Sequence, residues 1–145
     1  MPALKRVYLI GSLRNPHIPV LAGWLREQGI TVFDDWHAVG PDADDHWRDY
    51  EKARGHRFKE ALKGAAAQHV FDFDRTNLDE SAAVVMVMPA GKSGHLELGY
   101  AAGRGKATAI LLDKDPDRFD VMYNFASLVT DNNDELATWL KGVLA

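Results

Sequence analysis

Short apolar runs alternate with longer helical stretches along most of this chain, and this alternation limits the folds that it can adopt. The runs that predict strands are Val7–Ile10, Thr31–Phe33, Val70–Phe73, Val84–Met88 and Ala107–Leu112. Ala107–Leu112 is apolar without alternation, which is typical of a strand in a sheet that is covered on both faces. Strands alternating with helices predict an α/β fold, a doubly wound parallel sheet of about five strands.

The segments between these runs carry helical spacing or the residues that end helices. A helix beginning near Pro16 and Pro19 is expected to close at Gly29, and Gly103 and Gly105 are expected to end another that carries Leu96 and Leu98. The other helical segments are expected at 46–67, 76–81, 117–126 and about 133–144, the last capped by Asp131 or Asn132. In the segment 46–67 the expected buried side chains are Trp47, Tyr50, Phe58, Ala61 and Leu62.

The length of 145 residues fits a single domain spanning 1–145. The polar stretch Asp34–Asp45 predicts a long loop, and a long loop in a small domain is often functional.

Composition excludes several classes of function. The chain has 17 Lys+Arg against 21 Asp+Glu and no strongly basic run, so we expect neither a nucleic-acid polymer nor a membrane surface as partner. With no cysteine it has no disulfide, thiolate zinc site, iron–sulfur cluster or cysteine nucleophile. The first apolar run, Val7–Ile10, is too short for a secretory signal, and we expect a cytoplasmic protein.

Ligands of open parallel sheets bind at the carboxyl ends of the strands. The residues expected there are Gly11–Asn15, Asp34–His37, Asp72 with Asp74, and Pro89–Glu97.

The common cofactor-binding and metal-binding motifs are each incomplete in this sequence. Gly91-Lys92-Ser93 resembles the end of a phosphate-binding loop, but Met86 stands where that motif needs glycine, and Gly11 alone is not a dinucleotide fingerprint. His95-Leu96-Glu97 lacks the cysteines of a zinc deaminase. The six histidines lack zinc-ligand spacing, and a strand would turn only one of Asp72 and Asp74 towards a metal. We therefore expect no metal and no cofactor.

Glu97 and Asp74 form the pair of residues with the clearest chemical meaning. Glu97 is expected in the first turn of a helix, after Gly94, which would let the backbone approach a ligand. There it either interacts favourably with the helix dipole or lies at the ligand edge beside Asp74. Two carboxylates at one site suit glycosidic chemistry, in which one attacks the anomeric carbon and the other orients the sugar or handles the leaving group's proton.

Three further side chains are candidates for substrate binding. Ser12 and Arg14 are placed to donate hydrogen bonds to a sugar or a phosphate, although Arg14 fits a surface position equally well. Trp36 either stacks on a planar base or belongs to the core.

Three parts of the sequence together carry a family resemblance: Tyr8–Arg14 (YLIGSLR), Asp74 before Leu78, and Ser93–Ala101 (SGHLELGYA). In these parts the chain resembles the nucleoside 2-deoxyribosyltransferase family, which includes the 2-deoxynucleoside 5-phosphate N-hydrolases. The resemblance implies a flavodoxin-like fold, Glu97 as the nucleophile that forms a covalent deoxyribosyl intermediate, and Asp74 as its assistant. It also implies a homo-oligomer in which a neighbouring subunit completes the sugar pocket, a contribution that we assign to Asn124.

The sequence departs from this family around the 5-position of the sugar. Gly91 stands where the transferases carry an acidic residue, and Ser93 with Lys92 is the nearest equivalent of the serine loop of the phosphate-binding hydrolases. Ala82 stands just before the predicted strand Val84–Met88, at a position where the family commonly has a polar residue.

The expected function is therefore cleavage of the N-glycosidic bond of a small-molecule nucleoside or nucleoside 5-monophosphate, with transfer of the sugar to another base or to water. The alternative is a nucleotide-binding module of the same fold without activity. A third reading is cleavage of the nicotinamide N-glycosidic bond of NAD, which no residue favours. The sequence leaves the base, the sugar and the acceptor open.

Overall fold

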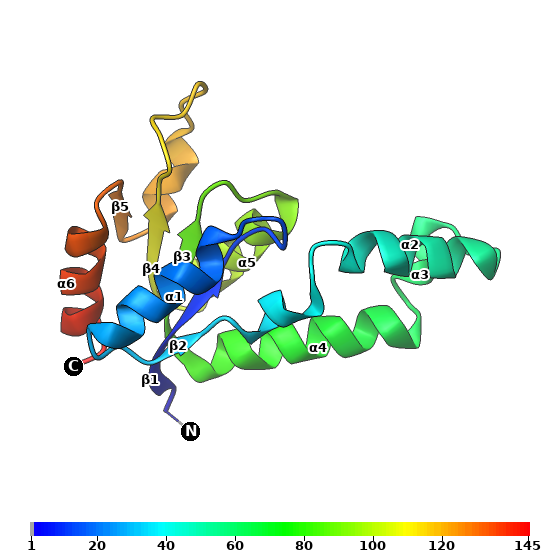
Figure 1. The fold of residues 1–145 in the computed structure, drawn as a ribbon, viewed down its shortest axis with the longest axis horizontal. Coiled ribbons are helices and arrows are strands. Elements are labelled where there is room, and N and C mark those ends of the chain that lie inside the picture. The colour runs from blue at the N-terminus through cyan, green and yellow to red at the C-terminus, as the bar shows by residue number, and fades with distance from the viewer. Residues whose placement is uncertain (1) are drawn as a thin grey trace.

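The computed structural model describes residues 2–145. They form one parallel sheet with helices on both faces (Figure 1). The strands are β1 (Leu4–Ile10), β2 (Val32–Phe33), β3 (Ser81–Val87), β4 (Ala107–Leu111) and β5 (Leu128–Thr130). They lie in the order β2-β1-β3-β4-β5, and all neighbouring pairs are parallel. This is the flavodoxin-like order, in which ligands bind where the connections from β1 and β3 diverge. The predicted fold class, a single α/β domain with a doubly wound sheet of five strands, is confirmed.

Two helices cover each face of the sheet. On one face α1 (His17–Glu27) and α6 (Asn133–Val143) pack against the side chains of Val7, Leu9 and Val85. On the other face α4 (Ala65–Glu80) and α5 (Lys92–Gly103) pack against Tyr8, Ile10 and Met86. Successive residues of β1 and β3 therefore enter opposite halves of the core, as the period of a strand requires.

The central strands are buried throughout, which explains their unbroken apolar sequence. Val84, Val85 and Met86 are fully inaccessible to solvent, because both faces of β3 are covered by helices. Burying a side chain of this size stabilises the fold by about 1.5–3 kcal/mol. The strands predicted at Val7–Ile10, Thr31–Phe33, Val84–Met88 and Ala107–Leu112 are all confirmed within one to three residues at their ends.

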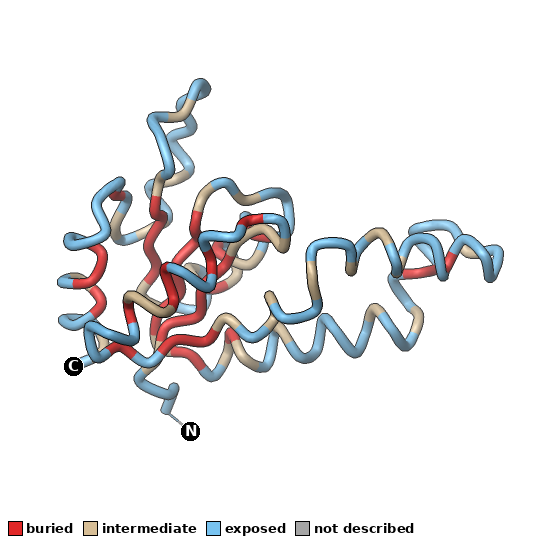
Figure 2. The backbone as a smooth tube through the Cα atoms, in the orientation of Figure 1, coloured by how far each residue is buried: buried red, intermediate tan, exposed pale blue. Residues whose placement is uncertain are grey.

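A helical arm projects from this body between β2 and β3. After the short 3-10 helix η1 (Asp35–Val39), α2 (Ala43–Ala53) runs away from the sheet, α3 (Phe58–Ala61) turns back, and α4 returns to the body (Figure 1). Figure 2 shows that this arm is mostly exposed. The expected loop Asp34–Asp45 thus contains η1 and the first turn of α2.

The prediction of a strand at Val70–Phe73 is wrong. These residues lie in the middle of α4, and the segment 76–81 that was expected to be a separate helix supplies its last turns and the first residue of β3. The β-branched and aromatic residues suggested a strand, but Val70, Phe71 and Phe73 are 45–58% exposed and pair with no strand of the sheet. The alanines at the start of α4 have the highest helix propensity and favour the helix instead.

The expected buried side chains of the arm are also mostly wrong. Ala61 is buried, whereas Tyr50, Phe58 and Leu62 are exposed and Trp47 is half-buried. These side chains stay exposed because the arm projects beyond the sheet, which does not cover it (Figure 1 and Figure 2).

The fifth strand, β5, was not predicted. Its three residues are too few for a recognisable period, and it forms because Ala109–Leu111 of β4 offers a parallel edge. The helix expected at 117–126 is reduced to the 3-10 helix η2 (Val121–Phe125). The last helix and its cap are confirmed, since Asn132 Oδ1 accepts a hydrogen bond from the backbone N–H of Glu135 at 2.9 Å.

Candidate active site

Two carboxyl groups and a phenol from three separate elements meet on the face of the sheet covered by α4 and α5. Tyr8 comes from β1, Asp74 from α4 and Glu97 from α5, and the charges of both carboxyl groups act on Tyr8. The topology explains why these three residues are close together. Strands β1 and β3 are neighbours in the sheet, α4 directly precedes β3 in the chain, and α5 follows it. Glu97 lies in the second turn of α5, not the first, since this helix begins at Lys92.

The environment of Glu97 favours its neutral form. Burial raises the pKa of the Glu97 carboxyl from its ordinary value to about 7, and the charge of Asp74 contributes in the same direction. A hydrogen bond from the Tyr8 hydroxyl opposes this and lowers the pKa of Glu97. Glu97 is therefore protonated in part of the molecules near neutral pH and ionised in the rest.

Asp74 is desolvated without compensation from the protein. Burial raises its pKa to about 6. Its Oδ1 atom is buried and has no hydrogen-bond partner among residues 2–145. An unpaired buried carboxylate oxygen is costly, so its presence beside Glu97 points to a group that a ligand completes. The sequence placed Asp74 after a strand, whereas it lies on α4, yet the two carboxyl groups are close enough to interact.

The environment of Tyr8 favours its protonated form, so its hydroxyl keeps its hydrogen at neutral pH. Burial raises the pKa of its phenol, and the charges of Glu97 and Asp74 raise it further. Sequence reasoning did not include Tyr8 among the candidate residues. The available signal was a hydroxyl within the apolar run Val7–Ile10, because a buried tyrosine needs a partner for its hydroxyl.

Aromatic rings extend from Tyr8 towards the arm. Tyr8 stacks on Phe33 of β2 with ring centroids 5.2 Å apart, and Phe33 lies 5.9 Å from Phe73 of α4. The Arg6 guanidinium lies 4.9 Å from the centre of the Phe33 ring. These rings form an apolar wall beside the two carboxyl groups.

Trp36 belongs to the framework around the site. Its indole N–H donates to the backbone oxygen of Leu9 at 2.7 Å, and its ring packs against both halves of the core. Of the two alternatives for this residue, the structure favours the core.

The loop after β1 is held by contacts within the protein. A Cβ on Gly11 would lie 2.5 Å from the Cδ1 atom of Ile18, so glycine here permits close packing against α1. Ser12 Oγ accepts the backbone N–H of Arg14 at 3.1 Å. The Arg14 guanidinium is exposed and donates to Asp45 of α2 at 2.9 Å. Arg14 thus joins the body to the arm.

The first turn of α5 contributes two exposed polar side chains and one buried glycine. Lys92 and Ser93 are exposed, and no acidic residue lies in this turn. A Cβ on Gly94 would lie 3.0 Å from both Ala90 Cβ and Ile10 Cγ2, so this glycine lets the helix approach β1 closely. That packing accounts for Gly94 without a ligand.

Helix η2 is fastened to the same turn of α5. His95 Nδ1 lies 2.8 Å from the Gly91 carbonyl oxygen and Nε2 lies 2.8 Å from the Tyr123 hydroxyl. A carbonyl only accepts, so Nδ1 donates to Gly91, while Nε2 and the Tyr123 hydroxyl form the second hydrogen bond. The neighbouring Asn124 is exposed and lines a hollow of about 320 Å³ on this side of the molecule, next to β5.

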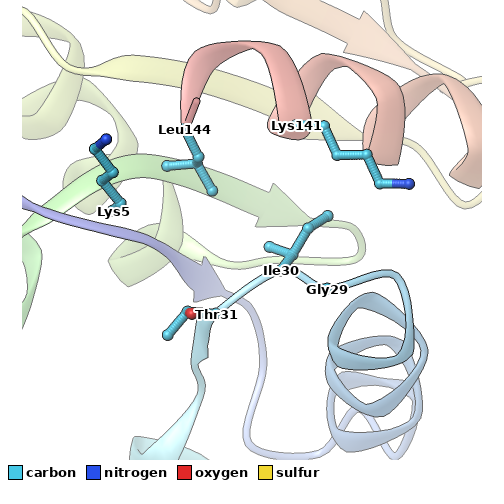
Figure 3. Close-up of a pocket in the computed structure, with 6 residues that line it drawn as sticks. All are labelled: Lys5, Gly29, Ile30, Thr31, Lys141 and Leu144. Carbon is cyan, nitrogen blue, oxygen red and sulfur yellow. The ribbon is translucent and has the colours of Figure 1, made fainter.

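A second cavity lies at the opposite end of the sheet. It has a volume of about 180 Å³ and is lined by residues from the start of β1, the turn after α1 and the end of α6 (Figure 3). Lys5, Ile30 and Leu144 are among them. This cavity is at the amino ends of the strands and contributes nothing to the site around Glu97.

Comparison with known proteins gives no family for this chain. No model of a protein family matches it, and no curated protein matches it in sequence. Across residues 2–145, none of the helices has the length and apolar character that a membrane crossing needs.

Proposed function

We propose that this protein cleaves the N-glycosidic bond of a nucleoside or nucleoside 5-monophosphate through a covalent glycosyl–Glu97 intermediate. It would thus act as a nucleoside 2-deoxyribosyltransferase or as the corresponding N-hydrolase. The observation that carries the proposal is the half-buried pair Glu97 and Asp74, which lies beside Tyr8 on one face of a doubly wound sheet. The Oδ1 atom of Asp74 is buried and has no hydrogen-bond partner among residues 2–145.

In the first step a carboxylate oxygen of Glu97 attacks the anomeric carbon of the sugar. A bond forms between Glu97 and C1, and the bond from C1 to the base nitrogen breaks with its electron pair going to the base. Tyr8 keeps the Glu97 carboxylate oriented by donating its hydroxyl hydrogen. The base nitrogen receives a proton from the Asp74 carboxyl, whose raised pKa keeps part of it protonated close to neutral pH.

In the second step an acceptor attacks C1 from the face that the base has left. Asp74, now ionised, takes a proton from the acceptor, and the bond between Glu97 and C1 breaks so that Glu97 leaves as a carboxylate. Another base as acceptor gives a new nucleoside, and water gives the free sugar. Two displacements at C1 retain its configuration.

The site also suits a cationic sugar transition state. An oxocarbenium-like centre carries developing positive charge, and a carboxylate desolvated by the protein stabilises that charge more strongly than a carboxylate in water. Glu97 supplies this carboxylate in the first step, and the ionised Asp74 adds a second one in the second step. The aromatic wall formed by Tyr8, Phe33 and Phe73 supplies an apolar flank for the sugar or base.

Recognition of the 5-position falls to the first turn of α5. Lys92 and Ser93 are exposed there without an acidic neighbour, and the amino end of a helix favours an anion. Arg14 is the weaker candidate, because Asp45 already pairs with its guanidinium. This charge pattern favours a 5-phosphate over a free hydroxyl.

We further propose that the protein works in the cytoplasm as a homo-oligomer in which Asn124 of one subunit reaches the sugar pocket of another. The exposure of Asn124 on η2 supports this role, as it does not lie buried in its own subunit. The absence of cysteine is compatible with a reducing compartment.

The proposal is tested by incubating the protein with nucleosides and nucleoside 5-monophosphates, ribo and deoxy, with and without a second base, and separating the products by chromatography. Free base without an acceptor identifies an N-hydrolase, and a new nucleoside formed only with the second base identifies a transferase. NAD is included as a further substrate. Ligand-dependent thermal stabilisation without any product would contradict the proposal and favour a binding module.

A further inference from the structure

The arm formed by α2, α3 and the first half of α4 buries too few of its own side chains to stabilise its helices. From Ala43 to Phe73, a stretch that the structure describes throughout, the buried residues are Glu51 and Ala61. Glu51 accepts hydrogen bonds from His56 at 2.8 Å and from Arg54 at 3.5 Å, so even this small core is polar. Helices of four and eleven residues are marginal in water without tertiary packing.

The same arm exposes large apolar side chains. They are Tyr50 (55% exposed), Phe58 (70%), Leu62 (45%), Val70 (58%) and Phe71 (57%). Phe58 and Leu62 are four residues apart and lie on one side of their helical turn. Apolar side chains gathered on one projecting element mark a surface that another molecule covers.

Acidic and basic residues are segregated along the arm, and this pattern indicates which molecule covers its exposed apolar side chains. The arm root, residues 42–49, lies beside the body, to which Arg14 joins it, and carries four carboxylates against one cation, Arg48. The arm tip, residues 52–63, is the far end (Figure 1) and carries five cations against one carboxylate, Glu60. A second arm laid antiparallel on the first brings each basic tip onto an acidic root.

We propose that the arms of two copies of this chain pack antiparallel about a two-fold axis and form a homodimer. The contact is isologous, so the tip-to-root attraction occurs twice, and the exposed apolar side chains of the two arms cover each other. A parallel arrangement would instead place like charges together. The inference specifies an interface and does not depend on the proposed chemistry at Glu97.

The test exchanges charges between tip and root. A tip-reversed variant, in which Lys52, Lys59 and Lys63 are all replaced by Glu, has an acidic tip and root. A root-reversed variant, Asp44→Lys with Asp49→Lys, has a basic tip and root. None of these positions is Tyr8, Asp74 or Glu97. A control variant outside the arm replaces the exposed Lys5, Lys114 and Lys141 by Glu, which matches the charge change of the tip-reversed variant.

The molecular mass of each protein is measured by analytical ultracentrifugation at low salt, without substrate. We expect the wild type and the control at twice 16.1 kDa. We expect each reversed variant to dissociate with a dissociation constant raised at least about tenfold, because like charges then face each other. An equimolar mixture of the two reversed variants is expected to restore the dimer, since both of its tip-to-root contacts are again complementary.

Restoration also shows that the variants are folded, and circular dichroism of each variant alone gives a second check. A monomeric wild type would overturn the proposal and leave the arm to a different partner. Reversed variants that remain dimeric, or a mixture of folded variants that does not dimerise, would overturn it as well.

Discussion

Tyr8 on strand β1 lies close enough to the Glu97 carboxyl group on α5 for each residue to shift the pKa of the other. This contact fixes the position of the acidic side chain relative to the most buried part of the sheet, where Tyr8 is 1% exposed. It also opposes the two effects that keep Glu97 neutral, burial and the charge of Asp74. The reactivity of Glu97 therefore depends on a residue that lies in the core.

Replacing Glu97 with glutamine removes the nucleophile and keeps the shape and the acceptor for Tyr8. We expect turnover of the best substrate to fall by at least about a thousandfold, the scale of losing a covalent nucleophile. The measurement is the initial rate of base release, with binding of the intact substrate followed by thermal shift. Unchanged turnover in a folded Glu97→Gln protein would remove Glu97 from the reaction.

The same substitution changes how stability depends on pH. The pKa of Glu97 in the folded protein, about 7, lies above its ordinary value, so its contribution to stability is complete below that ordinary value and is lost as pH rises through about 7. Glu97→Gln should therefore be more stable than wild type at pH 8 by roughly 1–3 kcal/mol and close to it at pH 5. Urea unfolding at both pH values measures this, and a difference that does not grow with pH would contradict it.

Tyr8→Phe keeps the ring stacked on Phe33 and removes the hydroxyl. Without that donor the pKa of Glu97 rises further, so the acidic limb of the pH–rate profile should move to higher pH. Stability should fall by about 1 kcal/mol, as is usual for a lost hydrogen bond. A fall in rate with no movement of the limb would show that Tyr8 acts only through packing.

Asp74→Asn tests proton transfer to the leaving base. We expect a rate loss of about 10²–10⁴-fold with an ordinary nucleoside, the usual contribution of a general acid. A substrate whose base leaves without protonation should be affected much less. Equal losses with both substrates would assign Asp74 to sugar binding instead.

Trp36→Phe distinguishes a framework role from base stacking. The substitution removes the hydrogen bond from the indole to Leu9 O, and we expect a loss of about 1–2 kcal/mol of stability with KM changed less than about threefold. A large rise in KM with stability unchanged would instead place the ring against the substrate.

The sequence predicted the sheet well because buried parallel strands leave a direct record as unbroken apolar runs. Val84–Met88 and Ala107–Leu112 were recognisable for that reason. Val70–Phe73 has a similar local sequence and yet lies in helix α4. It belongs to the part of the chain that extends beyond the sheet, where there is no strand for it to pair with (Figure 1). No pattern within four residues carries that information.

Glu97 and Asp74 of the candidate site were named from the sequence, whereas Tyr8 and the geometry of the site were not. The two carboxylates were chosen because both were expected at the carboxyl edge of the sheet and because both match the family that the chain resembles. Asp74 was expected at the end of a strand, whereas it interacts with Glu97 from helix α4. Arg14 could not be assigned from the sequence because its partner, Asp45, lies 31 residues away on the arm.

The most direct test of the account is mass spectrometry of the protein quenched with acid during turnover of a 2-deoxynucleoside or its 5-monophosphate. We expect an added deoxyribosyl or deoxyribosyl phosphate mass on the peptide that contains Glu97, and its absence in Glu97→Gln. Base release by the wild type with no such adduct, together with inversion at the anomeric carbon, would contradict the covalent mechanism proposed for Glu97.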